Sequence, residues 1–217
     1  EVAFEDYKPG DKLVPFKVLD GVMKGSELTG ISYEQLIPWF NPGEGAFKVI
    51  PGDYVTTEDG TGIVHIAPTF GADDAKVARL AGVPGLQVVD RNGDLQAQVD
   101  LRGRFFCVED LDPEYAAANM APEYAEWAGR YVKNAYDSTL AEDAPTLDVD
   151  ICVMLKQQNK AFRIEKHTHN YPHCWRTDKP VLYYPLNSWF IKTTAVRERM
   201  MELNEQIMWK PESTGTG

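Results

Sequence analysis

The sequence predicts an α+β fold, in which a small, strongly bent sheet or β-barrel carries helices on its outside. Short apolar runs that end at glycine or proline are interspersed with a few helical patterns, and no regular strand–helix–strand repeat joins them. The chain has 217 residues, of which 43% are hydrophobic and 11% aromatic, so it can bury a sizeable core. We therefore expect one good-sized domain, with or without a smaller appendage.

The predicted strands are short and lie mostly in the first half of the chain. They are expected over residues 14–19, 47–50, 62–67, 86–89, 95–99 and 162–165. The pair at 86–89 and 95–99 flanks Asn92-Gly93, a dipeptide that favours the tight turn of a β-hairpin. We therefore expect these two strands to pair in an antiparallel hairpin.

Helical patterns occur in segments that we expect to cover the sheet. They span residues 73–81, 121–136, 148–158 and 194–204. Segment 121–136 has the clearest pattern, and its apolar stripe is expected in the core (Tyr124, Trp127, Ala128, Tyr131, Val132, Ala135). Asp148 is expected to cap the helix that follows it. Beyond Lys166 an extended connector is expected to lead into the last helix.

Charge and cysteine content limit the class of protein. The formal net charge is −11, whereas a free-standing nucleic-acid binder usually has a basic surface. Basic residues are denser near the carboxyl end, where they could guide a nucleic-acid strand (Lys156, Lys160, Arg163, Lys166, Arg176, Lys179). Three widely spaced cysteines fit a reducing cytoplasm, and no apolar run suggests a membrane partner.

The most informative segment is residues 60–74, which read GTGIVHIAPTFGADD. A glycine-flanked strand is expected to end at Pro68, and a helix is expected to begin near two carboxylates, Asp73 and Asp74. Loops held by rigid elements concentrate binding and catalytic groups. His65 and Asp74 are therefore the predicted functional side chains of this segment.

This segment resembles the editing-domain signature of class I aminoacyl-tRNA synthetases of the isoleucyl type, GTGIVH-x-AP-x-x-G-x-x-D. Residues 167–192 (HTHNYPHCWRTDKPVLYYPLNSWFIK) resemble the return to the catalytic core, and residues 24–36 (KGSELTGISYEQL) also read like that family. The resemblance implies a β-barrel editing domain over 1–166 and a connector over 167–217. It also implies, as partners, the aminoacylated 3′ end of tRNA and a catalytic Rossmann domain of the same chain, in a monomer.

The resemblance assigns roles to the residues of the signature. Asp74 would recognise the amino group of the aminoacyl ester, although a helix-start carboxylate can also act only on the helix dipole. His65 would line the pocket near the substrate side chain or the terminal adenosine, although a histidine on a strand is often structural. The wall of the substrate pocket is expected to include Thr61, Gly62, Ala67, Pro68, Thr69 and Phe70. Asp73 is grouped with these substrate-binding residues and is also a candidate helix cap.

The implied reaction is hydrolysis of valine from the tRNA for isoleucine. One methylene gives only about 1–3 kcal/mol of discrimination, a limit for which isoleucyl enzymes are the standard example, so a second site must remove the error. An ester is already activated, so neither a metal nor a cofactor is expected in this segment. The signatures HIGH and KMSKS are absent, so ATP and magnesium would belong to the parent enzyme. The threonine-rich half of the family's pocket has no counterpart before Gly60.

Two other classes of function stay open. Imidazole and thiolate are zinc ligands, so the cluster of His167, His169, His173 and Cys174 allows a metal-dependent hydrolase. Its spacing is poor, and some members of the family that the chain resembles have the second cysteine of a C-x-x-C pair where Thr177 stands. Packing is therefore the preferred role of the cluster, and a zinc site is possible only elsewhere in the parent. The third class is a non-catalytic module that positions tRNA or spaces domains.

Overall fold

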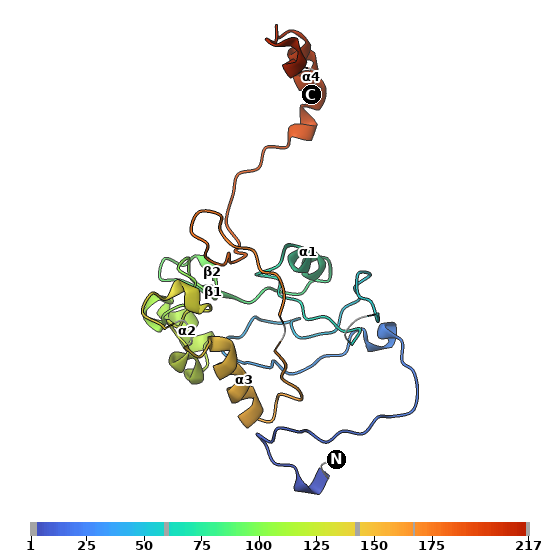
Figure 1. Cartoon of the computed structure of the whole chain (residues 1–217), viewed down its shortest axis with the longest axis vertical. Coiled ribbons are helices and arrows are strands. Elements are labelled where there is room, and N and C mark those ends of the chain that lie inside the picture. Colours follow the sequence, from blue (N-terminus) through green and yellow to red (C-terminus); the bar gives the residue numbers. More distant parts are fainter. Residues whose placement is uncertain (1–3, 59–60, 142–143, 167, 216–217) are drawn as a thin grey trace. The chain divides into compact units, whose positions relative to one another are not determined.

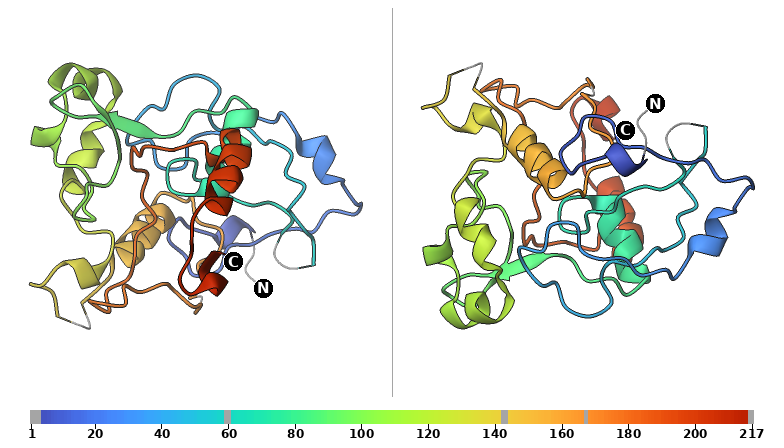
Figure 2. Two further views of the ribbon diagram at one scale, coloured as in Figure 1. Left: turned by 90° about the horizontal axis from the view of Figure 1, so that it is seen from above. Right: turned by 90° about the horizontal axis from the view of Figure 1, so that it is seen from below.

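The computed structural model describes residues 4–58, 61–141, 144–166 and 168–215. The chain divides into two compact units, Glu1–Pro185 and Leu186–Gly217. Figures 1 and 2 show the path of the chain, and each unit is described by itself below. The functional boundary near Lys166 remains a prediction.

The first unit is mixed α and β, which confirms the predicted class at that level. Its α-helices are α1 (Ala72–Leu80), α2 (Pro113–Asn119) and α3 (Leu147–Gln157), and its strands are β1 (Gln87–Val89) and β2 (Leu95–Ala97). Short 3₁₀ helices lie at Phe4–Asp6, Gly25–Leu28, Val108–Asp110, Pro122–Glu126 and Asn134–Tyr136. The regular sheet of the described residues has two strands, and no closed barrel is found among them, so the barrel remains a prediction.

The predicted hairpin is confirmed. β1 and β2 are antiparallel, with Gln87 opposite Ala97 and Val89 opposite Leu95. Asp90 shapes the turn, because its carboxylate accepts hydrogen bonds from the N–H groups two and four residues further on. Asp100 forms a second turn of the same design immediately afterwards, with bonds of 2.8 and 2.9 Å. This part of the chain is therefore two successive hairpins closed by aspartates.

The long helix predicted over residues 121–136 is wrong. Pro122 begins a 3₁₀ helix that ends at Glu126, and Gly129, at φ 75°, donates its N–H to Phe105 O at 2.9 Å. A second 3₁₀ turn follows at Asn134–Tyr136. Tyr124 and Trp127 are still buried, and Ala128 and Val132 pack against the core, because separate tight turns can repeat the spacing of a helix. Ala135 is exposed, so its predicted place in the core is wrong.

The core of the first unit is largely aromatic. Tyr124 is completely buried, its ring lies 4.5 Å from that of Phe40, and its hydroxyl donates to Phe106 O at 2.7 Å. Burial raises the pKa of Tyr124, so the hydroxyl stays a donor at physiological pH. The buried cluster consists of Trp39, Phe40, Val88, Leu111, Tyr124, Trp127 and Leu147.

Several predicted strands are not present in the described structure. Residues 14–19, 62–67 and 162–165 are extended or irregular without ladder partners, and residues 47–50 contribute only a single bridge, Ser32 to Lys48. The side chain of Ile63 is 62% exposed, so its apolar pattern does not reflect burial in a sheet. Local β propensity therefore overstated the sheet, because pairing depends on partners elsewhere in the chain.

The helix predictions are confirmed for three of the four segments. α1 and α3 occupy their expected positions within about two residues. Thr146 precedes α3 in the capping position without a side-chain hydrogen bond, and Asp148 lies within the first turn, so the predicted cap is wrong. α2 was missed; it begins at Pro113, and Asp112 caps it by accepting from Tyr115 N at 2.7 Å.

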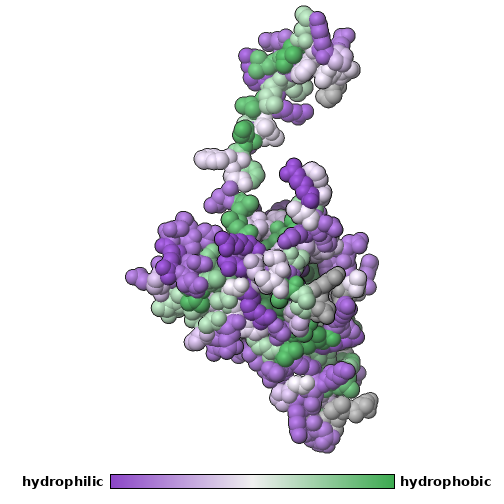
Figure 3. Space-filling view, turned by 60° about the vertical axis from the view of Figure 1, so that its left-hand side comes forward, coloured by the Kyte–Doolittle hydropathy of each residue, from purple (hydrophilic) through white to green (hydrophobic). Residues whose placement is uncertain are grey.

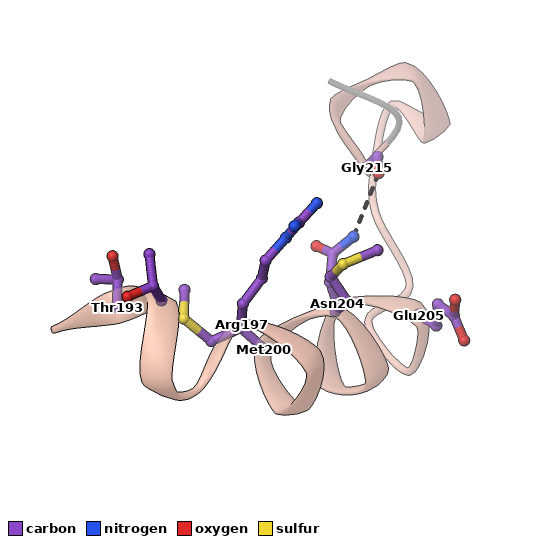
Figure 4. Close-up of a pocket in the computed structure, with 8 residues that line it drawn as sticks. Thr193, Arg197, Met200, Asn204, Glu205 and Gly215 are labelled. Carbon is purple, nitrogen blue, oxygen red and sulfur yellow. Dashed lines mark hydrogen bonds between the residues drawn. The ribbon is translucent and has the colours of Figure 1, made fainter.

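The second unit contains a 3₁₀ helix at Thr193–Ala195, the predicted α-helix as α4 (Arg197–Glu205), and a 3₁₀ helix at Glu212–Gly215. The last turn folds back on α4, where Asn204 Nδ2 donates to Gly215 O at 3.3 Å (Figure 4). A shallow hollow of about 650 Å³ lies beside α4. Trp189 and Phe190 are almost fully exposed in the extended segment before it, and Figure 3 shows apolar side chains along this segment. No helix in the described ranges has the length and apolar character to cross a bilayer.

Candidate functional site

Asp74 occupies the third position of α1 and reaches back across the preceding loop. Its Oδ2 atom accepts a hydrogen bond from Ala67 N at 2.9 Å. Gly71 makes this geometry possible, because a Cβ at that position would lie 2.7 Å from Oδ2 and 2.9 Å from Cγ. The loop and the first turn of α1 therefore hold the carboxylate in a fixed orientation.

The second oxygen of the Asp74 carboxylate is uncommitted. Among the described residues, the carboxylate of Asp74 makes no further hydrogen bond and no ion pair, and the residue is half-buried. A partly buried carboxylate with one anchored oxygen can offer the other to a cation, with a stronger bond than between neutral groups. Its chemistry is therefore suited to an ammonium group.

Asp73 differs from Asp74 in its exposure and its contacts. It is exposed in the first turn of α1, and Gly71, not Asp73, stands at the capping position. A carboxylate here is placed to interact with the positive end of the helix dipole. The alternative that Asp73 caps the helix is therefore wrong, and its role toward substrate remains a prediction.

His65 lies in the exposed, extended segment before the loop. No hydrogen bond or ion pair joins it to Asp74 within the part of the chain that the structure describes. Thr61 bonds only locally, through its hydroxyl, to the backbone of Ile63 at 3.3 Å. The structure thus fixes Asp74 more firmly than His65, and the role of His65 stays a prediction.

Two other predicted wall residues of the loop, Thr69 and Phe70, are held by residues later in the chain. Thr69 donates its hydroxyl to Leu86 O at 2.8 Å, so that hydroxyl is committed to the fold. Phe70 donates its N–H to Ala67 O at 3.0 Å, and its ring meets the ring of Tyr184 edge to face, with centroids 6.4 Å apart. Sequence reasoning missed Tyr184, since no local pattern connects residues so far apart in the chain.

Two hollows of the described structure are lined by residues outside this loop. One is the hollow beside α4, and the other, of about 360 Å³, lies between the amino-terminal segment and the end of α3. Gly62, Ala67 and Pro68 line neither of them. The candidate site is therefore defined by the fixed carboxylate and its loop, not by an enclosed cavity.

The histidines and cysteine of the second cluster do not form a metal centre among the described residues, where no group of three potential ligands is found. His167 lies outside these residues. Nδ1 of His169 lies 2.9 Å from Asn170 O, and Nδ1 of His173 lies 2.8 Å from Tyr171 O. The cluster is therefore tied to its own backbone.

Cys174 sits in a tight hairpin, in which its N–H donates to Lys179 O at 2.8 Å. A hydrogen bond from the Thr177 side chain lowers the pKa of the Cys174 thiol, and the backbone N–H groups of Arg176 and Thr177 add to this effect. Thr177, which replaces a possible second cysteine ligand, thus stabilises the thiolate of the first.

Comparison with known proteins identifies relatives along the whole chain. No protein-family model matches it. The isoleucine--tRNA ligase of Bacteroides fragilis (strain YCH46) is 65% identical over 218 residues, which cover 100% of this chain and 19% of that protein. The isoleucine--tRNA ligase of Porphyromonas gingivalis is 65% identical over 212 residues, 97% of this chain and 19% of that protein.

A more distant relative gives the same result. The isoleucine--tRNA ligase of Cytophaga hutchinsonii is 52% identical over 227 residues, with 100% of this chain and 19% of that protein covered. The chain thus spans about a fifth of the length of the curated relatives it matches. Identity at this level over the full chain establishes common ancestry, and the chain belongs, as one segment, to the isoleucine--tRNA ligase family.

Proposed function

We propose that this chain is the editing domain of an isoleucine--tRNA ligase, and that it hydrolyses the ester of valine attached in error to the tRNA for isoleucine. The relatives support the activity of the parent enzyme, and the signature at residues 60–74 supports the editing role. The observation that carries the proposal is the carboxylate of Asp74, half-buried, anchored through one oxygen and uncommitted at the other.

Asp74 would bind the α-ammonium group of the aminoacyl ester. Every aminoacyl-tRNA presents this group next to the ester carbonyl, so a fixed partner for it also fixes the reacting carbon. A hydrogen bond between charged groups contributes about 1.5–3 kcal/mol. The bond from Ala67 N keeps the carboxylate in place before substrate arrives, which lowers the entropy lost on binding.

The chemical step is ester hydrolysis. A water molecule attacks the carbonyl carbon, the bond from that carbon to the ribose oxygen breaks, and the ribose oxygen takes up a proton, which leaves free valine and uncharged tRNA. We propose that His65 lies near the substrate side chain or the terminal adenosine. The loop around it would form the wall (Thr61, Gly62, Ala67, Pro68, Thr69, Phe70, Asp73).

The rest of the proposal concerns the parent enzyme. Residues 1–166 would form the editing domain, barrel-like in the intact protein, and residues 167–217 the connector to the catalytic domain. That domain would use ATP and magnesium to attach isoleucine, in a monomeric cytoplasmic enzyme. Support comes from the relatives, which are isoleucine--tRNA ligases.

The test is deacylation of valyl-tRNA for isoleucine by the full-length ligase that contains this segment. Asp74→Ala should reduce kcat/KM by about 10- to 150-fold, the equivalent of 1.5–3 kcal/mol. Glu114→Ala is the matched control, because it removes an exposed carboxylate from the first turn of a helix outside the proposed site, and it should change the rate much less. Equal effects of the two substitutions would refute the assignment; no deacylation by the unsubstituted enzyme would favour a tRNA-positioning module.

A further inference from the structure

The segment from Tyr171 to Tyr184 is fastened to the body of the first unit by tyrosines. Tyr136 donates its hydroxyl to Pro180 O at 2.9 Å, and Tyr184 donates its hydroxyl to Val99 O at 2.7 Å. The ammonium group of Lys133 lies over the ring of Tyr171, 4.4 Å from its centroid. This segment therefore has a defined position on the body and is not a loose tether.

Tyr184 makes two contacts of different kinds. Its hydroxyl donates to the carbonyl of Val99, a buried residue immediately before the turn at Asp100. The ring meets Phe70 edge to face, with an interplanar angle of 70°, an arrangement favourable for aromatic pairs. Because the hydroxyl bond anchors the far end of the ring and the ring packs on Phe70, Tyr184 can restrain the position of Phe70.

The position of Phe70 matters for Asp74 through a short chain of bonds. Phe70 N donates to Ala67 O, and Ala67 N donates to Asp74 Oδ2. The carbonyl group of Ala67 thus closes the turn with Phe70, and its N–H group holds the carboxylate of Asp74. A movement of Phe70 would open that turn and alter the anchor of Asp74.

We propose that Tyr184 is a positioning residue for the candidate site, acting through Phe70 and Ala67 on the carboxylate of Asp74. This inference rests on the proposed function, because the positioned group matters only if Asp74 binds substrate. It adds to the site a residue that lies outside the signature at residues 60–74 and contacts that signature through Phe70.

The first test needs no activity. Amide hydrogen exchange is measured at Ala67 and Phe70 in the 217-residue chain and in variants of Tyr184. Tyr184→Leu removes the aromatic contact and should speed exchange at both amides about 3- to 10-fold. Tyr184→Phe keeps the ring but loses the bond to Val99, so it should have a smaller effect. Tyr183→Leu is the matched control, since Tyr183 is 55% exposed, and it should leave both amides unchanged.

The second test is a double-mutant cycle on deacylation by the full-length ligase. Tyr184→Leu and Phe70→Leu should each lower kcat/KM, and the double variant should be little slower than the slower single variant, because both act through one contact. Tyr184→Phe should restore most of the rate. A purely structural role for Tyr184 would instead give additive losses.

The two tests separate the inference from the function. Unchanged exchange at Ala67 in Tyr184→Leu, or additive losses in the cycle, would overturn the role of Tyr184 even if Asp74 proves essential. Faster exchange together with no deacylation by the unsubstituted enzyme would refute the proposed function, and with it the role in hydrolysis. Faster exchange with non-additive losses supports the inference.

Discussion

Replacing Gly71 by alanine tests how the carboxylate of Asp74 is held. The new Cβ would lie 2.7 Å from Asp74 Oδ2, closer than real Cβ contacts, so the carboxylate of Asp74 must shift. We expect this shift to break its bond to Ala67 N. A bond to a charged group contributes about 1.5–3 kcal/mol, and half-burial places this one near the lower end. Gly71 has extended backbone, with φ −138° and ψ 130°, which alanine adopts without strain. Replacing glycine by alanine there stabilises the fold by about 0.4–1 kcal/mol, because it lowers the entropy of the unfolded chain. We expect a net cost of about 1 kcal/mol.

The assay is amide exchange at Ala67, which should be about 5-fold faster in Gly71→Ala. Asp74→Ala provides the second arm of a cycle, because it removes the oxygen that clashes. In that background Gly71→Ala should leave exchange at Ala67 unchanged or slow it slightly. If Gly71→Ala speeds exchange equally with and without the Asp74 carboxylate, the loop is not held by that bond and the reasoning fails.

Two further predictions concern the body and the connector. Gly103→Ala should lower the free energy of unfolding, measured with urea, by about 1–3 kcal/mol more than Gly93→Ala. Both glycines have positive φ, but of the two only Gly103 lies where a new Cβ would meet a side chain, the Tyr136 ring at 2.5 Å. Equal losses of stability in the two variants would exclude the clash. Iodoacetamide should alkylate Cys174 with a pH midpoint below the ordinary thiol value of 9.0, since the lowered pKa populates the thiolate at lower pH. Thr177→Val should raise that midpoint, and an unchanged midpoint would contradict the assigned cause.

The sequence predicted elements whose signals are local. The helix after Gly71 has acidic residues in its first turn and a glycine after its end, and the hairpin has Asn92-Gly93 in its turn. The helix prediction at 121–136 failed because Pro122 and Gly129 redirect the backbone, while Tyr124 and Trp127 still reach the core. The sequence periodicity thus indicates most of the side chains that face the core. Backbone hydrogen bonds determine whether one helix or several separate turns bring them there.

The candidate site was predictable only in part. The signature identified Asp74, but the bond to Ala67 N depends on the path of the loop between them. Tyr184 reaches Phe70 through tertiary packing, which no local pattern encodes. The strand predicted over 62–67 failed for the same reason, since strand formation needs a partner that a local pattern does not reveal.

The most direct test of the central claim removes the positive charge from the substrate. Valyl-tRNA and N-acetylvalyl-tRNA for isoleucine are compared as substrates of the full-length ligase, unsubstituted and with Asp74→Ala. If Asp74 binds the ammonium group, acetylation should lower kcat/KM of the unsubstituted enzyme by about 10- to 150-fold and leave the slower variant nearly unaffected. Equal losses on acetylation in both enzymes would show that Asp74 does not contact the amine.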